Sequence, residues 1–406
     1  MEWIATLTWL RTPAITRTLK FVLLSSCIVI GGCSRLRPKL QKQYVYVTAK
    51  QTFLRDRVAA VSNRTGTVEN GDRLQVLEHG RRFLRVQTSK GELGWIDEKV
   101  VASQEVANGF DGLKTEHAKD PAVASAVVRD EVYMHLKPGR DTEKLYRLSE
   151  GEKLKLLRRA TLEKALPPGQ KAASATASAS IPAAASIASA GGRSAGGKKI
   201  AAAPLPSGPP MEDWWLVRDS QGRTGWLLSR MMDVDAPDTL TRYSEGQRIV
   251  GAYLLAKVND PEAPMDDKDV PEYVTVLSPY KAGLPYDFDQ VRAFTWNVKK
   301  HRYETGFRER NIEGFLPVEV KLAGDPYGRG LAAAVQAPTF SYRILTADAP
   351  AVVPDPVTGA VTPSKTMVKT YRLEGNLVRR VIAPGTTAPE PAHPQPVAEK
   401  KAKRRR

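Results

Sequence analysis

Only two residues of this chain carry a thiol, the side chain best suited to covalent chemistry, and both lie near the N-terminus. Cys27 lies inside an apolar stretch that begins at Phe21, and Cys33 ends the run Ile-Gly-Gly-Cys at 30–33. About a dozen apolar residues are too few to cross roughly 30 Å of hydrocarbon as a helix, so the stretch is typical of a signal peptide. Basic residues precede it, as in such signals: Arg11, Arg17 and Lys20.

The run at 30–33 resembles the lipobox of bacterial lipoproteins. The resemblance implies that a peptidase cuts before Cys33, that the Cys33 thiol is diacylated, and that the mature chain begins there. Acyl chains, at ~0.8 kcal/mol per buried CH₂, would then hold the protein on a membrane without a transmembrane helix. Ser34 in place of Asp resembles the sorting choice for the outer membrane. We therefore expect a lipid-anchored cell-envelope protein, facing the periplasm from the outer membrane if the host is Gram-negative. The alternative is an uncleaved apolar anchor at 21–30.

The charge of the chain favours an acidic neighbour. Its 406 residues carry 61 basic and 44 acidic side chains, a net charge of +17. Loss of residues 1–32 would leave Cys33 as the only cysteine, so the mature chain could form no internal disulfide. A strongly basic balance suits anionic lipid or cell-wall polymer, whereas nucleic acid is not an expected partner outside the cytoplasm. No oligomeric state is predicted.

Residues that would support catalysis are scarce. A papain-like mechanism needs a cysteine activated by a histidine, but both cysteines belong to the signal. The five histidines stand singly, without the close pairing of zinc sites. A carboxylate-rich stretch at 260–272 lacks the ligand order of a calcium loop and is broken by prolines, so we expect an acidic surface loop. We therefore predict no enzymatic activity, no metal and no cofactor. An enzyme with an unrecognised site in the C-terminal β domain is the alternative.

The elements that would position a binding site are found in an internal repeat. Residues 84–96 align without a gap on 215–227, and each copy closes with Gly-Trp followed by Ile or Leu. Residues 70–77 align equally well on 150–157. Apolar residues alternate within each copy and glycines mark the turns, a pattern of short half-buried strands. Each copy is therefore a small β unit.

These features resemble the bacterial SH3 (SH3b) domain, whose pattern is an opening strand with Arg, a Gly-acidic turn, an aromatic strand and a closing Gly-Trp. The resemblance covers residues 44–103 and 127–233 and implies two small SH3-like barrels. It also implies binding to peptidoglycan or envelope peptides, or a scaffolding role in an envelope complex. His135 stands where the family usually has Arg. In the first copy the matching segments are 52–55, 70–72, 83–86 and 94–96; in the second they are 132–135, 150–152, 214–217 and 225–227.

The second copy contains a long insertion. Residues 158–213 separate the matching strands, where the first copy needs only 78–82. The segment at about 161–211 is rich in Ala, Ser, Gly and Pro and is predicted to be disordered. Because loop closure costs only ~0.6 kcal/mol per doubling of length, a hairpin can tolerate such an insertion. A linker between separate domains is the alternative.

The rest of the chain is predicted to form a third domain and a tail. Alternating apolar residues at 239–382 indicate an antiparallel β domain, ending in a hairpin with its turn at 374–376. Residues 383–406 are proline-rich and then basic, which predicts a disordered tail. The predicted fold class is thus all-β, with two small SH3-like barrels followed by an antiparallel β domain.

Aromatic and basic side chains of the barrels are the candidate ligand contacts. Strand alternation places Trp214 and Trp215 on opposite faces, so we expect one in the core and one exposed. Trp95 and Trp226 are expected to fill the barrel cores. The candidate binding residues are Trp214, Trp215, Phe83, Arg85 and Tyr133.

The lipobox resemblance predicts cleavage and acylation, which change the mass of the chain. Expressed in a bacterial envelope, the wild-type chain should lose residues 1–32, carry acyl chains on Cys33 and partition into detergent. Cys33→Ala should keep its full length and remain unacylated. Intact mass spectrometry with detergent partitioning checks both outcomes, and a wild-type protein that retains residues 1–32 would contradict the lipobox prediction.

Overall fold

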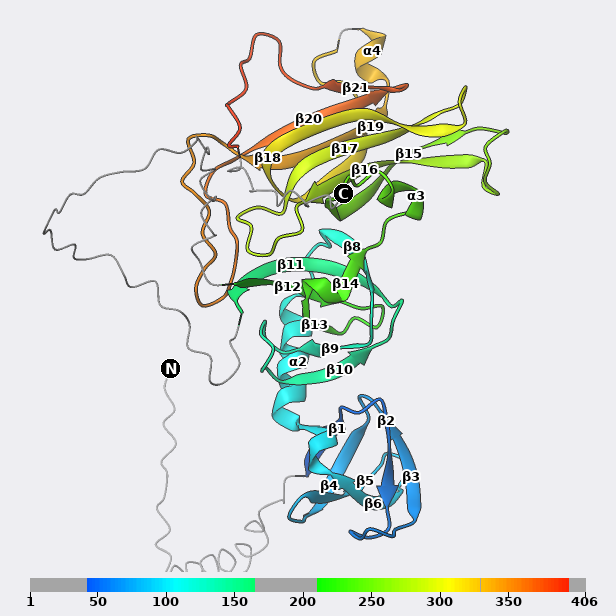
Figure 1. Ribbon diagram of the computed structural model, residues 1–406, viewed down its shortest axis with the longest axis vertical. Helices are drawn as coiled ribbons and strands as arrows, with labels where there is room; N and C mark the ends of the chain where they lie inside the picture. The colour runs from blue at the N-terminus through cyan, green and yellow to red at the C-terminus, as the bar shows by residue number, and fades with distance from the viewer. Residues whose placement is uncertain (1–41, 165–209, 329, 394–406) are drawn as a thin grey trace, which may run out of the picture. The chain divides into compact units, whose positions relative to one another are not determined.

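The structure, a computed structural model, describes residues 42–164, 210–328 and 330–393 (Figure 1). Within these residues the chain is mostly β, with antiparallel sheets, which confirms the predicted fold class. The predicted signal and Cys33, most of the predicted insertion and the basic end of the tail lie outside the described residues. None of the described helices is long and apolar enough to cross a membrane.

The first sheet, barrel 1, has the strand order β3-β2-β6-β5-β4-β1-β7. Its core consists of one or two inward residues from most strands, including Leu54, Val86 and Ile96. Intervening residues face outward, as strand alternation requires. The strands are β1 (Gln43–Val47), β2 (Gln51–Arg55), β3 (Arg64–Glu69), β4 (Arg73–His79), β5 (Phe83–Gln87), β6 (Leu93–Asp97) and β7 (Val101–Ser103).

The second sheet, barrel 2, repeats this arrangement with the order β10-β9-β13-β12-β11-β8-β14. Each strand corresponds to the one at the same place in barrel 1, so the sequence repeat is also a repeat of topology. The strands are β8 (Ala124–Val128), β9 (Val132–His135), β10 (Lys144–Leu148), β11 (Lys153–Glu163), β12 (Met211–Arg218), β13 (Thr224–Leu228) and β14 (Met232–Val234).

A helix that the sequence analysis did not predict, α2 (Gln104–Glu116), connects the barrels. Ser103 caps it by accepting a hydrogen bond from the Val106 amide. Phe110 is fully buried and meets Tyr146 edge-on at 5.3 Å between ring centroids. This helix therefore contributes its apolar side to the core of barrel 2.

The strands around the predicted insertion form one hairpin. β11 and β12 pair continuously from Arg158↔Leu216 to Glu163↔Met211. Residues 165–209 therefore connect two paired strands of a single sheet.

The third sheet follows chain order, β15-β16-β17-β18-β19-β20-β21, so the last predicted hairpin completes it. One buried cluster contains Trp215 and Val217 of barrel 2 together with Phe288 and Tyr342 of this sheet. Its elements are α3 (Asp238–Thr241), β15 (Arg248–Asn259), β16 (Asp269–Ser278), β17 (Phe288–Asn297), β18 (Arg302–Ala323), α4 (Leu331–Ala334), β19 (Ala337–Leu345), β20 (Thr366–Glu374) and β21 (Leu377–Arg380).

The structure corrects the predicted start of the disordered tail. The Ala392 amide donates to Leu345 O at 2.9 Å, and the Ala347 amide donates to Glu390 O at 2.8 Å. Ala392 also packs against a small buried cluster of the third domain. Residues 390–392 therefore belong to the folded part, because their backbone pairs with residues 345–347 at the end of β19.

The acidic stretch at 260–272 was predicted to be a surface loop, but two of its carboxylates are buried. Asp260 and Glu272 are each 1% exposed. The Trp296 indole donates to Asp260 Oδ2 at 2.8 Å, and the Trp296 amide donates to Glu272 Oε1 at 2.8 Å. Buried carboxylates are tolerated only when hydrogen bonds replace water, and Trp296 supplies one to each. Asp260 also accepts from the Glu262 amide at 3.0 Å and lies 2.8 Å from His301 Nδ1.

In barrel 1, β6 crosses β2 closely at Gly94, and this contact can be tested by substitution. A Cβ at Gly94 would lie 2.5 Å from Thr65 Oγ1 and 2.6 Å from Leu54 Cβ, whereas a Cβ at Gly112 in α2 would meet nothing within 4 Å. We expect Gly94→Ala to destabilise barrel 1 by about 1–3 kcal/mol through overpacking. The matched control, Gly112→Ala, should be neutral or up to about 1 kcal/mol stabilising. Native-state hydrogen exchange of barrel 1 and α2 amides measures both changes, and equal effects would contradict the crossing.

Candidate ligand-binding face

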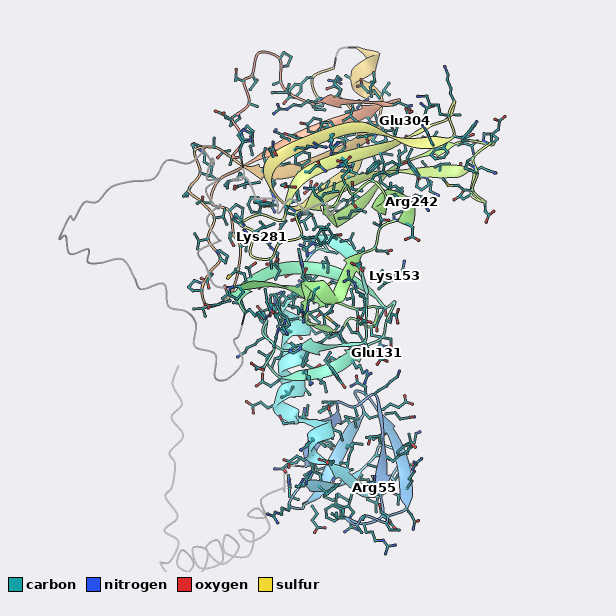
Figure 2. All side chains as sticks on the ribbon, viewed as in Figure 1. Arg55, Glu131, Lys153, Arg242, Lys281 and Glu304 are labelled. Atoms are coloured by element: carbon teal, nitrogen blue, oxygen red, sulfur yellow. The ribbon has the colours of Figure 1, made fainter. Side chains whose placement is uncertain are left out.

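Three side chains form a row on the outer face of barrel 1. Trp95 of β6 is the register partner of Arg55 in β2 on one side and of Arg85 in β5 on the other. Directly paired residues project to the same face of a sheet. We call these three residues the Arg–Trp–Arg row; Figure 2 labels Arg55 on barrel 1.

Burial confirms that the row faces outward. The chain neighbours Leu54, Leu84 and Ile96 are at most 3% exposed and belong to the core. Arg55 is exposed, and 48% of the Arg85 side chain is accessible. The row is therefore open to a ligand from outside the barrel.

The direction of Trp95 follows from Gly94. Gly94 points inward at the tight crossing with β2, where a side chain has no room. Strand alternation then turns Trp95 outward and Ile96 inward. The ring lies against the β4–β5 turn, where a Cβ on Gly80 would come within 3.2 Å of a Trp95 ring carbon.

The prediction that Trp95 and Trp226 fill the barrel cores is therefore wrong. Both are only partly buried, and neither belongs to a core cluster. Ile96 and Leu227, one residue further on, occupy the core positions instead. The aliphatic residues Leu54 and Ile96 mark the inward positions of their strands. Assigning Ile96 to the core would have predicted from the sequence that Trp95 faces outward.

The surroundings of the row are basic. The Arg55 guanidinium donates to Ser62 Oγ at 2.8 Å, which holds it against the long β2–β3 loop. Arg64, opposite Arg55 in β3, lies over the Phe53 ring at 3.8 Å. Two carboxylates lie near the row. Asp97 follows Trp95 by two residues on the same face of β6, opposite Phe83. Glu78 lies 3.6 Å from Arg85, and both side chains are about half exposed, so water screens this pair. The β4–β5 turn adds two exposed arginines, Arg81 and Arg82.

This arrangement can bind anions and flat groups. Guanidinium groups present a planar fork of donors that suits carboxylates, and an indole ring offers a surface for stacking. The row can therefore contact a ligand through charge, hydrogen bonds and stacking.

Two of the predicted candidate residues lie on this face. Arg85 is part of the row, and Phe83 is two residues before it on the same strand, so both project outward. Arg55 and Trp95, the other members of the row, were not among the candidates. The structure thus extends the predicted site in barrel 1.

The expectation that either Trp214 or Trp215 is exposed is wrong. Their exposed fractions are 2% and 7%. Trp214 meets the His135 ring edge-on at 5.3 Å, while Trp215 belongs to the cluster shared with the third sheet. β12 is buried on both faces from Asp213 to Val217, so alternation placed the two rings correctly on opposite faces but exposed neither.

The β9–β10 loop of barrel 2 is bonded to the strand that carries Trp214. Arg140 Nε donates to both carboxylate oxygens of Glu212 at 3.0 Å, two residues before Trp214. Thr142 Oγ1 lies 3.0 Å from His135 Nδ1. These contacts tie the loop to β9 and β12.

The candidate Tyr133 is covered by cations of its own barrel. Lys144 Nζ lies 4.8 Å from the centroid of its ring, and Arg147 Cζ lies 5.7 Å from it. Such cation–π contacts occupy the face of the ring that a ligand would use.

Barrel 2 has no arginine at the positions that correspond to Arg55 and Arg85. The partners of Trp226 are His135 and Leu216, in place of Arg55 and Arg85. Leu216 is fully buried. Burial, with a smaller effect of nearby Lys144, lowers the pKa of His135, so the imidazole is neutral at pH 7. The row of barrel 2 therefore carries no charge.

Metal binding finds no support in the part of the chain that the structure describes. No group of three or more His, Cys, Asp or Glu side chains is placed there to hold an ion.

Comparison with known proteins identifies the first barrel. Residues 51–102 match the model of the bacterial SH3 domain family. A search of curated proteins found no match. Among solved structures, NlpC2 from Trichomonas vaginalis is 8% identical with a TM-score of 0.15, covering 57% of this chain and 63% of that one. NlpC1 from Trichomonas vaginalis is 7% identical with a TM-score of 0.15, covering 68% of this chain and 95% of that one. The chain thus spans less than two thirds of NlpC2, and similarity at these TM-scores supports no inference.

The difference in burial between Arg85 and Trp214 predicts different effects of their substitution on stability. Arg85→Ala removes an exposed side chain and should change stability by less than about 0.5 kcal/mol. Trp214→Ala empties a buried site and should cost about 3–5 kcal/mol. Denaturant melts of both variants check the contrast; a large loss for Arg85→Ala would mean that the row is structural.

Proposed function

We propose that this protein is a non-enzymatic, lipid-anchored component of the cell envelope that binds peptidoglycan or envelope peptides through barrel 1. The observation that carries the proposal is the Arg–Trp–Arg row, exposed on a domain that matches the bacterial SH3 family. An exposed row of two guanidiniums around an indole suits an anionic, partly apolar ligand.

Electrostatics support an acidic envelope ligand. Arg64 and Arg55 lie in the adjacent strands β3 and β2, and Arg85 lies in β5, with β6 between β2 and β5. Glu78 neutralises only part of their charge. The whole chain has the same sign, with a net charge of +17. A basic surface of this kind raises the local concentration of anionic partners and speeds their encounter.

The anchor in this proposal is Cys33. An acylated cysteine would keep barrel 1 near the membrane, where wall peptides and envelope proteins are concentrated. The scaffold alternative uses the same anchor and the same row, but with an envelope protein as the ligand instead of the wall.

A pull-down separates the wall from protein partners. Wild-type chain should sediment with purified cell wall, and Arg55→Ala/Arg85→Ala should lose at least about tenfold of this binding, because each charged hydrogen bond contributes about 1.5–3 kcal/mol. The binding should also weaken as salt is raised. The charge-matched control, Arg158→Ala/Arg302→Ala, removes two arginines whose side chains are 58% and 63% exposed.

The control should sediment like the wild type. Equal losses in both double variants would show that only net charge matters and would count against the row. Capture of envelope proteins by the row, with no binding to purified wall, would support the scaffold alternative.

A further inference from the structure

Three arginines of the third domain meet at a single carboxylate. Arg292 of β17 is the register partner of Arg308 in β18, and Arg310 follows two residues later on the same face. Glu245, in the turn between α3 and β15, reaches all three through one oxygen. Its Oε2 lies 3.0 Å from Arg292 Nη2 and 3.2 Å from Arg310 Nη2, and it accepts a hydrogen bond from Arg308. We call the three arginines the arginine cluster; because one oxygen contacts them all, their guanidiniums converge on one point.

The cluster lies on the face of the third sheet that is turned away from the core shared with barrel 2. Val291 and Ala293, which alternate with Arg292, are fully buried in that core. The side chain of Arg292 is 2% exposed, whereas those of Arg308 and Arg310 are 29% and 51% exposed. The cluster therefore has a buried floor and an open rim that a ligand can reach from solvent.

One carboxylate does not balance this cluster. Within the described residues, Glu245 is the acid that forms ion pairs with it, so three positive charges against one negative charge leave a net charge of +2. Like charges directly opposite one another in neighbouring strands are destabilising, and Arg292 and Arg308 are placed in this way. A further anion would relieve this repulsion.

The buried member of the cluster lacks acceptors. Arg292 Nη1 donates to the Tyr243 carbonyl, but among the described residues its Nε and Nη2 have no hydrogen-bond partner. Nη2 is close to Glu245 Oε2 without the alignment of a hydrogen bond. Buried polar groups are normally hydrogen-bonded, so these two donors mark a place for an additional acceptor.

Glu245 occupies the centre of the cluster without being fixed there. Its side chain is 53% exposed, and its φ of 53° is one that residues other than glycine seldom adopt. The turn is held on both sides of it. Tyr243 O accepts from the cluster, while Gln247 donates to Asp289 Oδ1 and accepts from Gln290 Nε2, both at 3.0 Å. The carboxylate can therefore rotate into solvent while the turn stays in place.

We propose that the arginine cluster is a phosphate-binding site, which Glu245 occupies when no ligand is bound. A phosphate monoester carries a charge of about −1.5 to −2 at pH 7 and three strong acceptor oxygens. It can give each guanidinium its own oxygen, whereas Glu245 serves all three mainly through one. Arginine also binds phosphate through paired, parallel hydrogen bonds. The phosphate is carried by a lipid headgroup or by a soluble molecule, and the inference is independent of the function proposed for barrel 1.

Removal of the internal carboxylate should open the site. All proteins are full-length chains with Cys33→Ala, so that no acyl chain at this position contributes. At constant ionic strength, Glu245→Gln should bind inorganic phosphate at least about tenfold more tightly than the parent, because no carboxylate competes for the arginines. It should also prefer phosphate to acetate, which has a single charge and two oxygens. Isothermal titration calorimetry measures these affinities, with an expected stoichiometry of one.

Glu374→Gln is the matched control. Glu374 is 45% exposed and also pairs with two arginines, Arg372 and Arg379. Arg372 donates to two backbone carbonyls as well, and Arg379 also pairs with Asp325. Since both guanidiniums keep acceptors without Glu374, this variant should bind phosphate no more tightly than the parent.

Arg310→Ala assigns the binding to the cluster. Added to Glu245→Gln, it should lower the phosphate affinity at least about tenfold, because a charged hydrogen bond is lost. Arg302→Ala removes an arginine of the same strand whose side chain is 63% exposed, and it should leave the affinity unchanged. Thermal melts followed by circular dichroism check the fold of each variant. Phosphate should also raise the melting temperature of the parent, and Arg310→Ala should abolish this rise, which tests the site even if Glu245→Gln is unstable.

Vesicles identify the source of the phosphate. Sedimentation with phosphatidylcholine vesicles that contain phosphatidic acid, lost in Arg310→Ala but kept in Arg302→Ala, would assign the site to a lipid headgroup. Binding of inorganic phosphate without such sedimentation would assign it to a soluble phosphate monoester.

Two results would overturn the inference. One is a phosphate affinity of Glu245→Gln that does not exceed that of the parent and of Glu374→Gln. The other is an affinity, or a phosphate-induced rise in melting temperature, that Arg310→Ala leaves unchanged. Either would reduce the cluster to a structural ion-pair network centred on Glu245.

Discussion

The organisation of both barrels depends on one steric constraint, the crossing of two strands so close that only glycine fits between them. In barrel 1 the crossing is at Gly94, where an added Cβ would lie 2.6 Å from Leu54 Cβ. In barrel 2 it is at Gly225, where a Cβ would lie 2.8 Å from Met134 Cβ. Because the glycine is the inward residue, the tryptophan after it must face outward. Barrel closure and the position of the indole therefore have the same cause.

The two barrels share one topology but differ in what packs against them. Trp215 of barrel 2 shares a buried cluster with Phe288 and Tyr342 of the third sheet. An ion pair between Arg159 and Asp287, 3.0 Å apart and with side chains 8% and 14% exposed, lies at the same junction. Removing one partner of such a pair would leave a buried charge without compensation, so replacing either residue alone should be destabilising. Barrel 2 is thereby part of the core of the larger unit, whereas barrel 1 keeps an outer face with exposed arginines.

This difference explains why recognition is assigned to barrel 1. An exposed arginine makes little contribution to stability, so cations on an outer face are free to serve a ligand. In barrel 2 the corresponding positions have become an aliphatic residue and a neutral histidine, which suit burial. In the proposed function, barrel 1 is thus the binding module, while barrel 2 packs against the third sheet.

The sequence by itself determined the strands that match between the two copies, their repeat and their closing Gly-Trp motifs, because alternation and glycine turns are local properties. It also indicated Phe83 and Arg85 as surface residues. It did not reveal helix α2, whose apolar side is fitted to barrel 2, or the pairing of Ala392 with the end of β19. Only the tertiary structure decided that Trp95 faces outward and is partly buried, and that Trp214 and Trp215 are both buried. Alternation assigns a side chain to one of two faces, but whether a face meets solvent depends on what other parts of the chain pack against it.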